Sequence, residues 1–182
     1  MSLDRPVAPD PYDLLPPVAA FDLTSDDLTD GQPMAIDYAH PSVGGKDISP
    51  HLRWSGQPAG TASFVVTCLD PDAPTGSGFW HWSMVNLPST VSELPRGAGT
   101  ETSANLPSGT FQIRNDYGQA AYGGAAPPAG DRPHRYVFAV HAVDVPALDI
   151  TPDASPAVVG FNLAFHTLAR ATLRASFAVP AS

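Results

Sequence analysis

The sequence has little that would anchor the chain in a membrane or cross-link it. Its single cysteine, Cys68, lies within an apolar run, which excludes a disulfide inside the chain and favours a small buried hydrophobic side chain. No window approaches the roughly 18 apolar residues that span a bilayer, and the N-terminus lacks the apolar stretch of a signal peptide. The sequence therefore predicts a cytoplasmic protein without stable membrane insertion.

Basic residues are also scarce. Lys and Arg number 9 against 18 Asp and Glu, which gives a formal net charge of -9. Proteins that bind nucleic acids or anionic membranes normally present a basic patch, and none is visible here. We expect no nucleic-acid partner, and an anionic ligand must be bound by local groups against the overall field.

Proline, in contrast, is abundant. The 21 prolines are scattered through the chain, which disfavours long helices and suits short strands joined by turns. A length of 182 residues fits one domain. We predict an irregular N-terminal arm over residues 1–20, where prolines interrupt regular structure, followed by a single domain over residues 21–182.

Patterns of apolar and β-branched residues predict a strand-rich domain with one late helix. The expected strands lie at 21–24, 34–38, 51–54, 63–69, 79–87, 111–115 and 135–145. Ser155 is a candidate N-cap and Pro156 a candidate first helical residue, and apolar residues recur near helical spacing after them. The sequence predicts a helix from Pro156 to Arg174.

Two of the predicted strands carry histidines near their starts. Because side chains alternate along a strand, His134 and Tyr136 share one face, and the residue between them points to the other. On the earlier strand, the same rule places His81 on the face opposite Trp80 and Trp82. The two tryptophans are interpreted as core residues.

A pair of aspartates follows a buried strand. Asp70 and Asp72 lie where that strand leaves the sheet, a position at which binding groups are common. Prolines stiffen the segment, and we predict a cis bond between Ala73 and Pro74, because cis prolines usually mark tight turns.

These groups suggest a site for a small anion. A carboxylate that accepts a hydrogen bond from imidazole holds the ring as an imidazolium, which attracts an anion. Asp70 and Asp72 would then orient the donor groups. Backbone N–H groups of Gly123 and Gly124 would add further donors to the anion, because glycine permits close approach of the backbone to a ligand.

Other chemistries use the same residue types. Two aspartates and two histidines also suit a metal, but they lie on separate segments without a short metal-binding spacing, so no metal is expected. A hydrolase using Asp70 and His81 as acid and base is a further alternative. The chain has no Gly-x-Ser-x-Gly motif and its cysteine is expected to be buried, so we do not predict an enzyme.

Three segments together resemble the phosphatidylethanolamine-binding protein family, also called Raf kinase inhibitor-like proteins. The segment from Asp70 to Trp82 resembles the first half of the family signature. The segment from Tyr122 to Gly130, closed by His134-Arg135-Tyr136, resembles the second half, and Ser49 to Trp54 resembles a further family element. The resemblance covers about residues 21–177 and is greatest to the bacterial branch.

The resemblance implies a fold and a pocket. The implied fold is mainly β, with a large antiparallel sheet packed against a smaller sheet as a Greek-key-like sandwich, a C-terminal helix and short peripheral helices. In this sequence the implied ligand-binding residues are Asp70, Asp72, Pro74, His81, Gly124, Pro127, Pro128, His134 and Tyr136. Ala125 and Ala126 depart from the Pro-Cys pair of many bacterial relatives.

The resemblance also implies a set of partners. It favours binding of a phosphate-bearing ligand, such as the phosphoethanolamine headgroup of a phospholipid, without a cofactor. The alternative is a protein-binding regulator that inhibits a kinase or a protease. Because bacterial relatives tend to pair, a homodimer is a further expectation.

Overall fold

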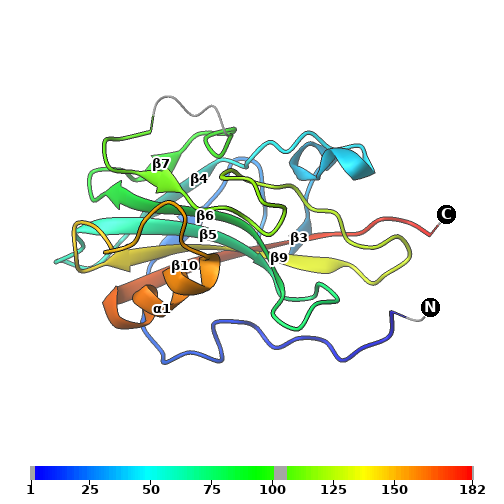
Figure 1. Ribbon diagram of the computed structural model, residues 1–182, viewed down its shortest axis with the longest axis horizontal. Coiled ribbons are helices and arrows are strands. Elements are labelled where there is room, and N and C mark those ends of the chain that lie inside the picture. The colour runs from blue at the N-terminus through cyan, green and yellow to red at the C-terminus, as the bar shows by residue number, and fades with distance from the viewer. Residues whose placement is uncertain (1–2, 101–105, 182) are drawn as a thin grey trace.

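The computed structural model describes residues 3–100 and 106–181, which fold mainly as β-structure (Figure 1). The larger sheet has seven strands, and its main path runs β1-β10-β9-β5-β6-β8, with β3 also paired to β10. These strands are β1 (Ala19–Ala20), β3 (Gln32–Pro33), β5 (Ser63–Asp70), β6 (Phe79–Pro88), β8 (Phe111–Gln112), β9 (His134–Val143) and β10 (Thr167–Phe177).

The smaller sheet is antiparallel and packs against one face of the larger sheet. It contains β2 (Asp22–Thr24), β4 (Leu52–Ser55) and β7 (Glu93–Leu94), in the order β2-β4-β7. Two short 3-10 helices, η1 (Ile36–Tyr38) and η2 (Pro41–Val43), follow β3. The expected sandwich is therefore present.

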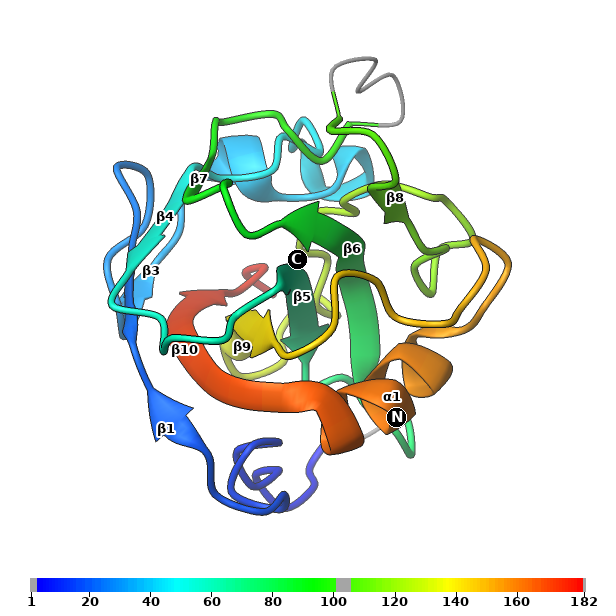
Figure 2. The same ribbon diagram turned by 90° about the vertical axis from the view of Figure 1, so that its left-hand side faces the viewer.

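The larger sheet is mixed rather than purely antiparallel as expected. Its central strands pair antiparallel, whereas β1 and β3 pair parallel with β10. Figure 2 shows these two short strands beside β10 at the sheet edge. Both come from the N-terminal part of the chain. Strand β10, the last long strand, therefore holds the N-terminal segments in the larger sheet.

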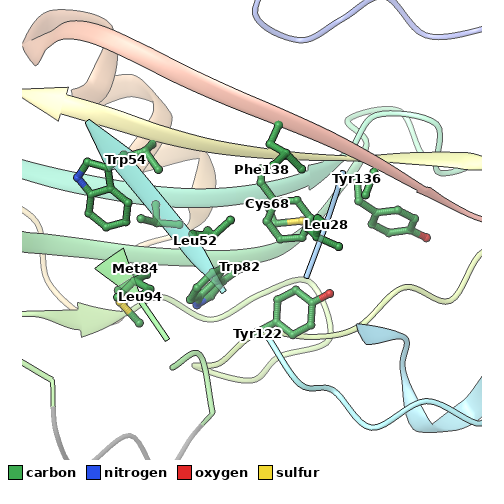
Figure 3. Packing of buried hydrophobic residues seen from close by; sticks show 14 of the residues in the cluster. Leu28, Leu52, Trp54, Cys68, Trp82, Met84, Leu94, Tyr122, Tyr136 and Phe138 are labelled. Carbon is green, nitrogen blue, oxygen red and sulfur yellow. The ribbon is translucent and has the colours of Figure 1, made fainter. Parts of the chain in front are cut away.

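The central strands are covered on both faces. All eight residues of β5 are buried. On one face, Trp54 of the smaller sheet packs with Phe64, Trp82 and Phe138 of the larger sheet (Figure 3). A separate apolar cluster, in which Val159 belongs to α1, covers the other face. Burial on both faces explains why β5 is mostly apolar and β-branched and does not alternate between apolar and polar residues.

The late helix is shorter than predicted. Helix α1 (Pro156–His166) begins as expected, because the Ser155 side chain accepts a hydrogen bond from the Val158 N–H and Pro156 is the first helical residue. Residues 167–174, predicted as helix, belong to β10 instead. In β10 the small residues Ala169 and Ala171 alternate with more exposed ones, a period of two. No helix in the described residues is long and apolar enough to cross a membrane.

Two local predictions were wrong. Residues 34–38 do not form a strand but lead into η1. The bond between Ala73 and Pro74 is trans, since no cis bond occurs in the described residues. The chain turns there through a hydrogen bond instead, since the Thr75 N–H donates to the Ala73 carbonyl at 2.7 Å. This bond closes a three-residue turn whose central position suits proline.

The N-terminal arm is irregular from Leu3 to Val18 and ends in β1. Residues 1 and 2 of the predicted arm lie outside the described residues. The arm crosses the face of the larger sheet that carries α1 (Figures 1 and 2). Arginine side chains fix it there: Arg132 donates to the Arg5 and Pro6 carbonyls, and Arg174 pairs with Asp10 at 2.6 Å.

Candidate functional site

A β-bulge places His81. Trp82 of β6 pairs with Cys68 of β5, and Trp80 pairs with the next residue, Leu69. His81 is therefore an extra residue without a partner on β5. Trp82 packs between the sheets, while Trp80 and Leu69 face α1. The two tryptophans therefore lie on opposite faces, and the prediction that they share one was wrong. Bulges commonly redirect side chains beside functional sites.

The bulge brings His81 to the same side of the sheet as Tyr136. The two rings meet edge to face, with centroids 5.0 Å apart. They line a pocket of about 390 Å³, whose full lining is Ser42, Asp70, Ala73, Pro74, Thr75, Phe79, His81, Tyr117, Ala126, Pro127, Pro128, His134 and Tyr136. Seven of the nine sequence-predicted residues are among them. Asp72 and Gly124 are not.

His134 is held between two carboxylates inside the protein. Its Nδ1 lies 2.7 Å from Oδ2 of Asp70, and its Nε2 lies 2.9 Å from Oδ2 of Asp131. Burial alone would lower the pKa of His134, but the hydrogen bonds to the two carboxylates outweigh it and raise the pKa. The raised pKa favours the protonated ring, and both ring nitrogens are used within the protein.

Asp131 is a site residue that the sequence patterns did not reveal. Hydrogen bonds from Arg5, and then from His134, hold the pKa of this carboxyl well below its usual range. Arg5 reaches it from the N-terminal arm at 2.8 Å. The only signal was its position three residues before His134, which a turn converts into contact.

Asp72 points away from the pocket. Its carboxylate receives two hydrogen bonds from the Arg135 guanidinium, at 2.7 and 2.8 Å, and a third from the Arg135 backbone N–H. Burial opposes ionisation, but these bonds lower the pKa of Asp72. The expectation that Asp72 orients ligand donors was wrong, because it lies on the arm side with Arg135, whose side chain alternates away from His134 and Tyr136.

The two glycine N–H groups expected to face a ligand are used within the protein. The Gly123 N–H donates to the His81 carbonyl at 2.8 Å, and the Gly124 N–H donates to Oδ1 of Asp47 at 2.7 Å. Gly124 has a packing role instead: a Cβ there would lie 2.2 Å from the Ala39 carbonyl carbon. Glycine is required because two loops touch at this point.

Two polar groups of the pocket remain for a ligand, one on His81 and one on Tyr136. His81 Nδ1–H donates to the Gly123 carbonyl at 2.7 Å, and burial lowers the pKa of the ring, so Nε2 is left as an acceptor in the neutral form. The Tyr136 hydroxyl is buried and has no hydrogen-bond partner within residues 3–100 and 106–181. Figure 3 shows this hydroxyl pointing away from Trp54 and the rest of the apolar cluster.

Comparisons with known proteins agree on one family. The sequence model described as phosphatidylethanolamine-binding protein matches residues 24–178. YbhB of Escherichia coli is 52% identical over 157 residues, which cover 85% of this chain and 98% of YbhB.

Solved structures give the same result. The crystal structure of Escherichia coli YbcL, titled a new member of the mammalian family of these proteins, has a TM-score of 0.85 and 43% identity, and the match covers 88% of this chain and 99% of YbcL. A phosphatidylethanolamine-binding protein homologue from Chlamydia trachomatis has a TM-score of 0.72 and 29% identity, over 87% of this chain and 97% of the homologue.

Proposed function

Because the chain belongs to the phosphatidylethanolamine-binding protein family, we propose that its pocket binds a small phosphate-bearing anion, with phosphoethanolamine as the model ligand. The observation that carries this proposal is the buried hydroxyl of Tyr136, a residue that is 1% exposed; this hydroxyl has no hydrogen-bond partner among the described residues. An unsatisfied buried hydroxyl costs about 1–3 kcal/mol. A ligand oxygen that accepts from Tyr136 removes this cost.

The charges around the pocket support an anion despite the acidic protein. The two carboxylates beside His134 are balanced by its imidazolium and by Arg5, so this wall is close to neutral. His81 adds a group that gains a proton when an anion arrives: its Nε2 then donates to a ligand oxygen. Binding thereby creates the second donor next to Tyr136.

The overall charge favours a zwitterionic ligand over inorganic phosphate. With a net charge of -9, the protein repels a dianion at long range. An ammonium group attached to the phosphate ester reduces that repulsion. Phosphoethanolamine carries both groups, and we propose that it binds more tightly than phosphate.

We propose binding without catalysis. The hydrolase alternative needs Asp70 to activate His81, yet Asp70 bonds His134, and the Nδ1 of His81 bonds a backbone carbonyl. We also propose a small ligand rather than a kinase or protease as the first partner, because Tyr136, which carries the buried hydroxyl, lines a pocket and not an open surface.

The test is a calorimetric titration of the full chain with phosphoethanolamine, phosphate and ethanolamine. Tyr136→Phe is expected to weaken phosphoethanolamine binding by about tenfold or more, as for a hydrogen bond to a charged group. Tyr122→Phe is the matched control, because that hydroxyl donates to the Tyr38 carbonyl in the core. Equal affinity of the wild type and Tyr136→Phe, or tighter binding of ethanolamine alone, would falsify the proposal.

A further inference from the structure

A second pocket lies on the opposite face of the larger sheet, beneath the N-terminal arm. Its volume is about 240 Å³, and it is bounded by the sheet, α1 and the arm. Leu69 and Trp80 form its floor, Val159 and Leu163 of α1 form one wall, and Tyr12 of the arm forms another. The surface is mainly apolar.

One wall of this second pocket is polar and internally connected. The Arg170 Nε–H points to His141 Nδ1 at 3.4 Å, and His141 Nε2 lies 3.4 Å from the Tyr12 hydroxyl. That hydroxyl lies 3.1 Å from Oγ1 of Thr67. The contacts to His141 are long for hydrogen bonds, so these groups retain capacity to bond a ligand.

Arg170 supplies the positive charge of this wall. Its guanidinium lies over the Tyr12 ring, 4.3 Å from the centroid, and forms none of the ion pairs found among residues 3–100 and 106–181. Arg135 and Arg174, also near the arm, pair with Asp72 and Asp10.

The neighbouring groups of the wall stay uncharged. Burial raises the pKa of Tyr12 to about 12 and lowers the pKa of His141 to about 3. A half-buried guanidinium without a carboxylate partner, facing an apolar pocket, is an unusual arrangement, since buried charges are normally paired. It indicates an anionic partner that the protein itself does not provide.

We propose that this second pocket binds a small apolar monocarboxylate, with the carboxylate on Arg170 and the hydrocarbon part against Leu69, Trp80 and α1. The size is suitable, because an apolar cavity of about 150 Å³ holds benzene, and the larger volume here leaves room for a short acidic side chain. Arg is suited to the task, since its planar guanidinium bonds both oxygens of a carboxylate.

The N-terminal arm closes this site with residues that lie outside the family match. The family match begins at residue 24, whereas Tyr12 and its arm neighbours Pro11 and Leu15 close the pocket. The floor and the helix wall of the second pocket belong to the matched residues, whereas the arm that closes it does not, and the pocket is distinct from the one at His81. The second pocket also gives a role to the N-terminal arm, which the resemblance to the family does not explain.

The test compares phenylacetate with its uncharged amide, phenylacetamide, by calorimetry on the full chain. Phenylacetate is expected to bind at least about tenfold more tightly, because only the carboxylate forms charge-assisted bonds. Arg170→Gln is expected to remove that preference while leaving amide binding unchanged. Arg114→Gln is the matched control, because Arg114 is exposed and does not line this pocket.

A filling variant tests the location without endangering the fold. A Cβ at Gly160 of α1 meets nothing within 4 Å, so Gly160→Leu extends into open space beside the pocket and also improves helix propensity. It is expected to abolish binding of both compounds while the melting temperature is maintained.

Three results would overturn the proposal. The first is equal affinity of acid and amide, and the second is no binding of phenylacetate at millimolar concentration. The third is phenylacetate binding that falls in Tyr136→Phe but not in Arg170→Gln, which would place the compound in the pocket at His81.

Discussion

The carboxylate of Asp131 lies 2.9 Å from Nε2 of His134 and completes an arrangement in which one histidine ring meets two carboxylates. Each partner stabilises the charge of the others, and the removal of one leaves an unbalanced charge. The stability of the fold should therefore depend on pH through His134.

The sign of that dependence follows from the raised pKa of His134. The ion pairs contribute fully below the unfolded-state pKa of about 6.5, and their contribution is lost as pH rises through the higher folded-state value. Asp131→Asn should lower the melting temperature by roughly 3–8 °C at pH 6 and reduce its decline at higher pH. Thermal unfolding between pH 6 and 9 measures both effects, with the exposed Asp149→Asn as control. An unchanged pH profile in Asp131→Asn would contradict this account.

Anion binding should strengthen as pH falls, because the pKa of His81 is lowered by burial in the free protein and the anion favours the protonated ring. Sulfate is a suitable probe, since its charge is constant in this range. Its affinity should rise by up to about tenfold per pH unit as one proton is taken up. Calorimetry from pH 8 to 5 tests this, and His81→Gln should be insensitive to pH. Equal slopes for both proteins would exclude His81 as the titrating group.

Gly124 should tolerate no side chain, because the added Cβ would lie 2.2 Å from backbone atoms of Ala39. Gly124→Ala is expected to destabilise the protein by about 3 kcal/mol or to prevent folding. Gly76→Ala is the matched control: its Cβ meets nothing within 4 Å, and the change should stay within about 0.5 kcal/mol. Denaturant unfolding distinguishes the two, and similar midpoints would show that the loops at Gly124 separate easily.

Cys68 should be chemically silent in the folded protein. The side chain is 0% exposed, and burial raises the pKa of its thiol well above the usual value. A thiol reagent should label the native chain at least about 1,000-fold more slowly than the denatured chain, because reaction requires opening of the core. Rapid native labelling would mean that the central sheet opens locally. As this is the only cysteine, the reagent reports on one site.

Sequence patterns predicted best where a strand is regular. His134 and Tyr136 share a face because β9 pairs without interruption along this end. The same rule failed at His81, because alternation cannot reveal an inserted residue. The helix prediction failed after His166 because apolar residues in β10 also fit a helical period over a short window.

The contacts of the site were harder to predict than its members. Asp72 and His134 were expected together, but β5 ends at Asp70 and the turn that follows sends Asp72 to Arg135 on the far face. Asp131 and Arg5 were missed because a turn and a distant arm bring them to His134, and neither leaves a periodic signal. Pairing across segments depends on tertiary geometry, which local pattern does not encode.

The inserted residue at His81 also sets how this strand responds to a change in length. Loss of His81 would leave Trp82 opposite Cys68 and Trp80 opposite Leu69, so β6 would pair without interruption and its other side chains would keep their faces. The pocket beside Tyr136 would lose one wall, whereas the cavity under α1 would keep Trp80. The bulge thus adds one side chain to a pocket without disturbing the ladder on either side of it, so a deletion at this position would separate the role of His81 from the pairing of the sheet.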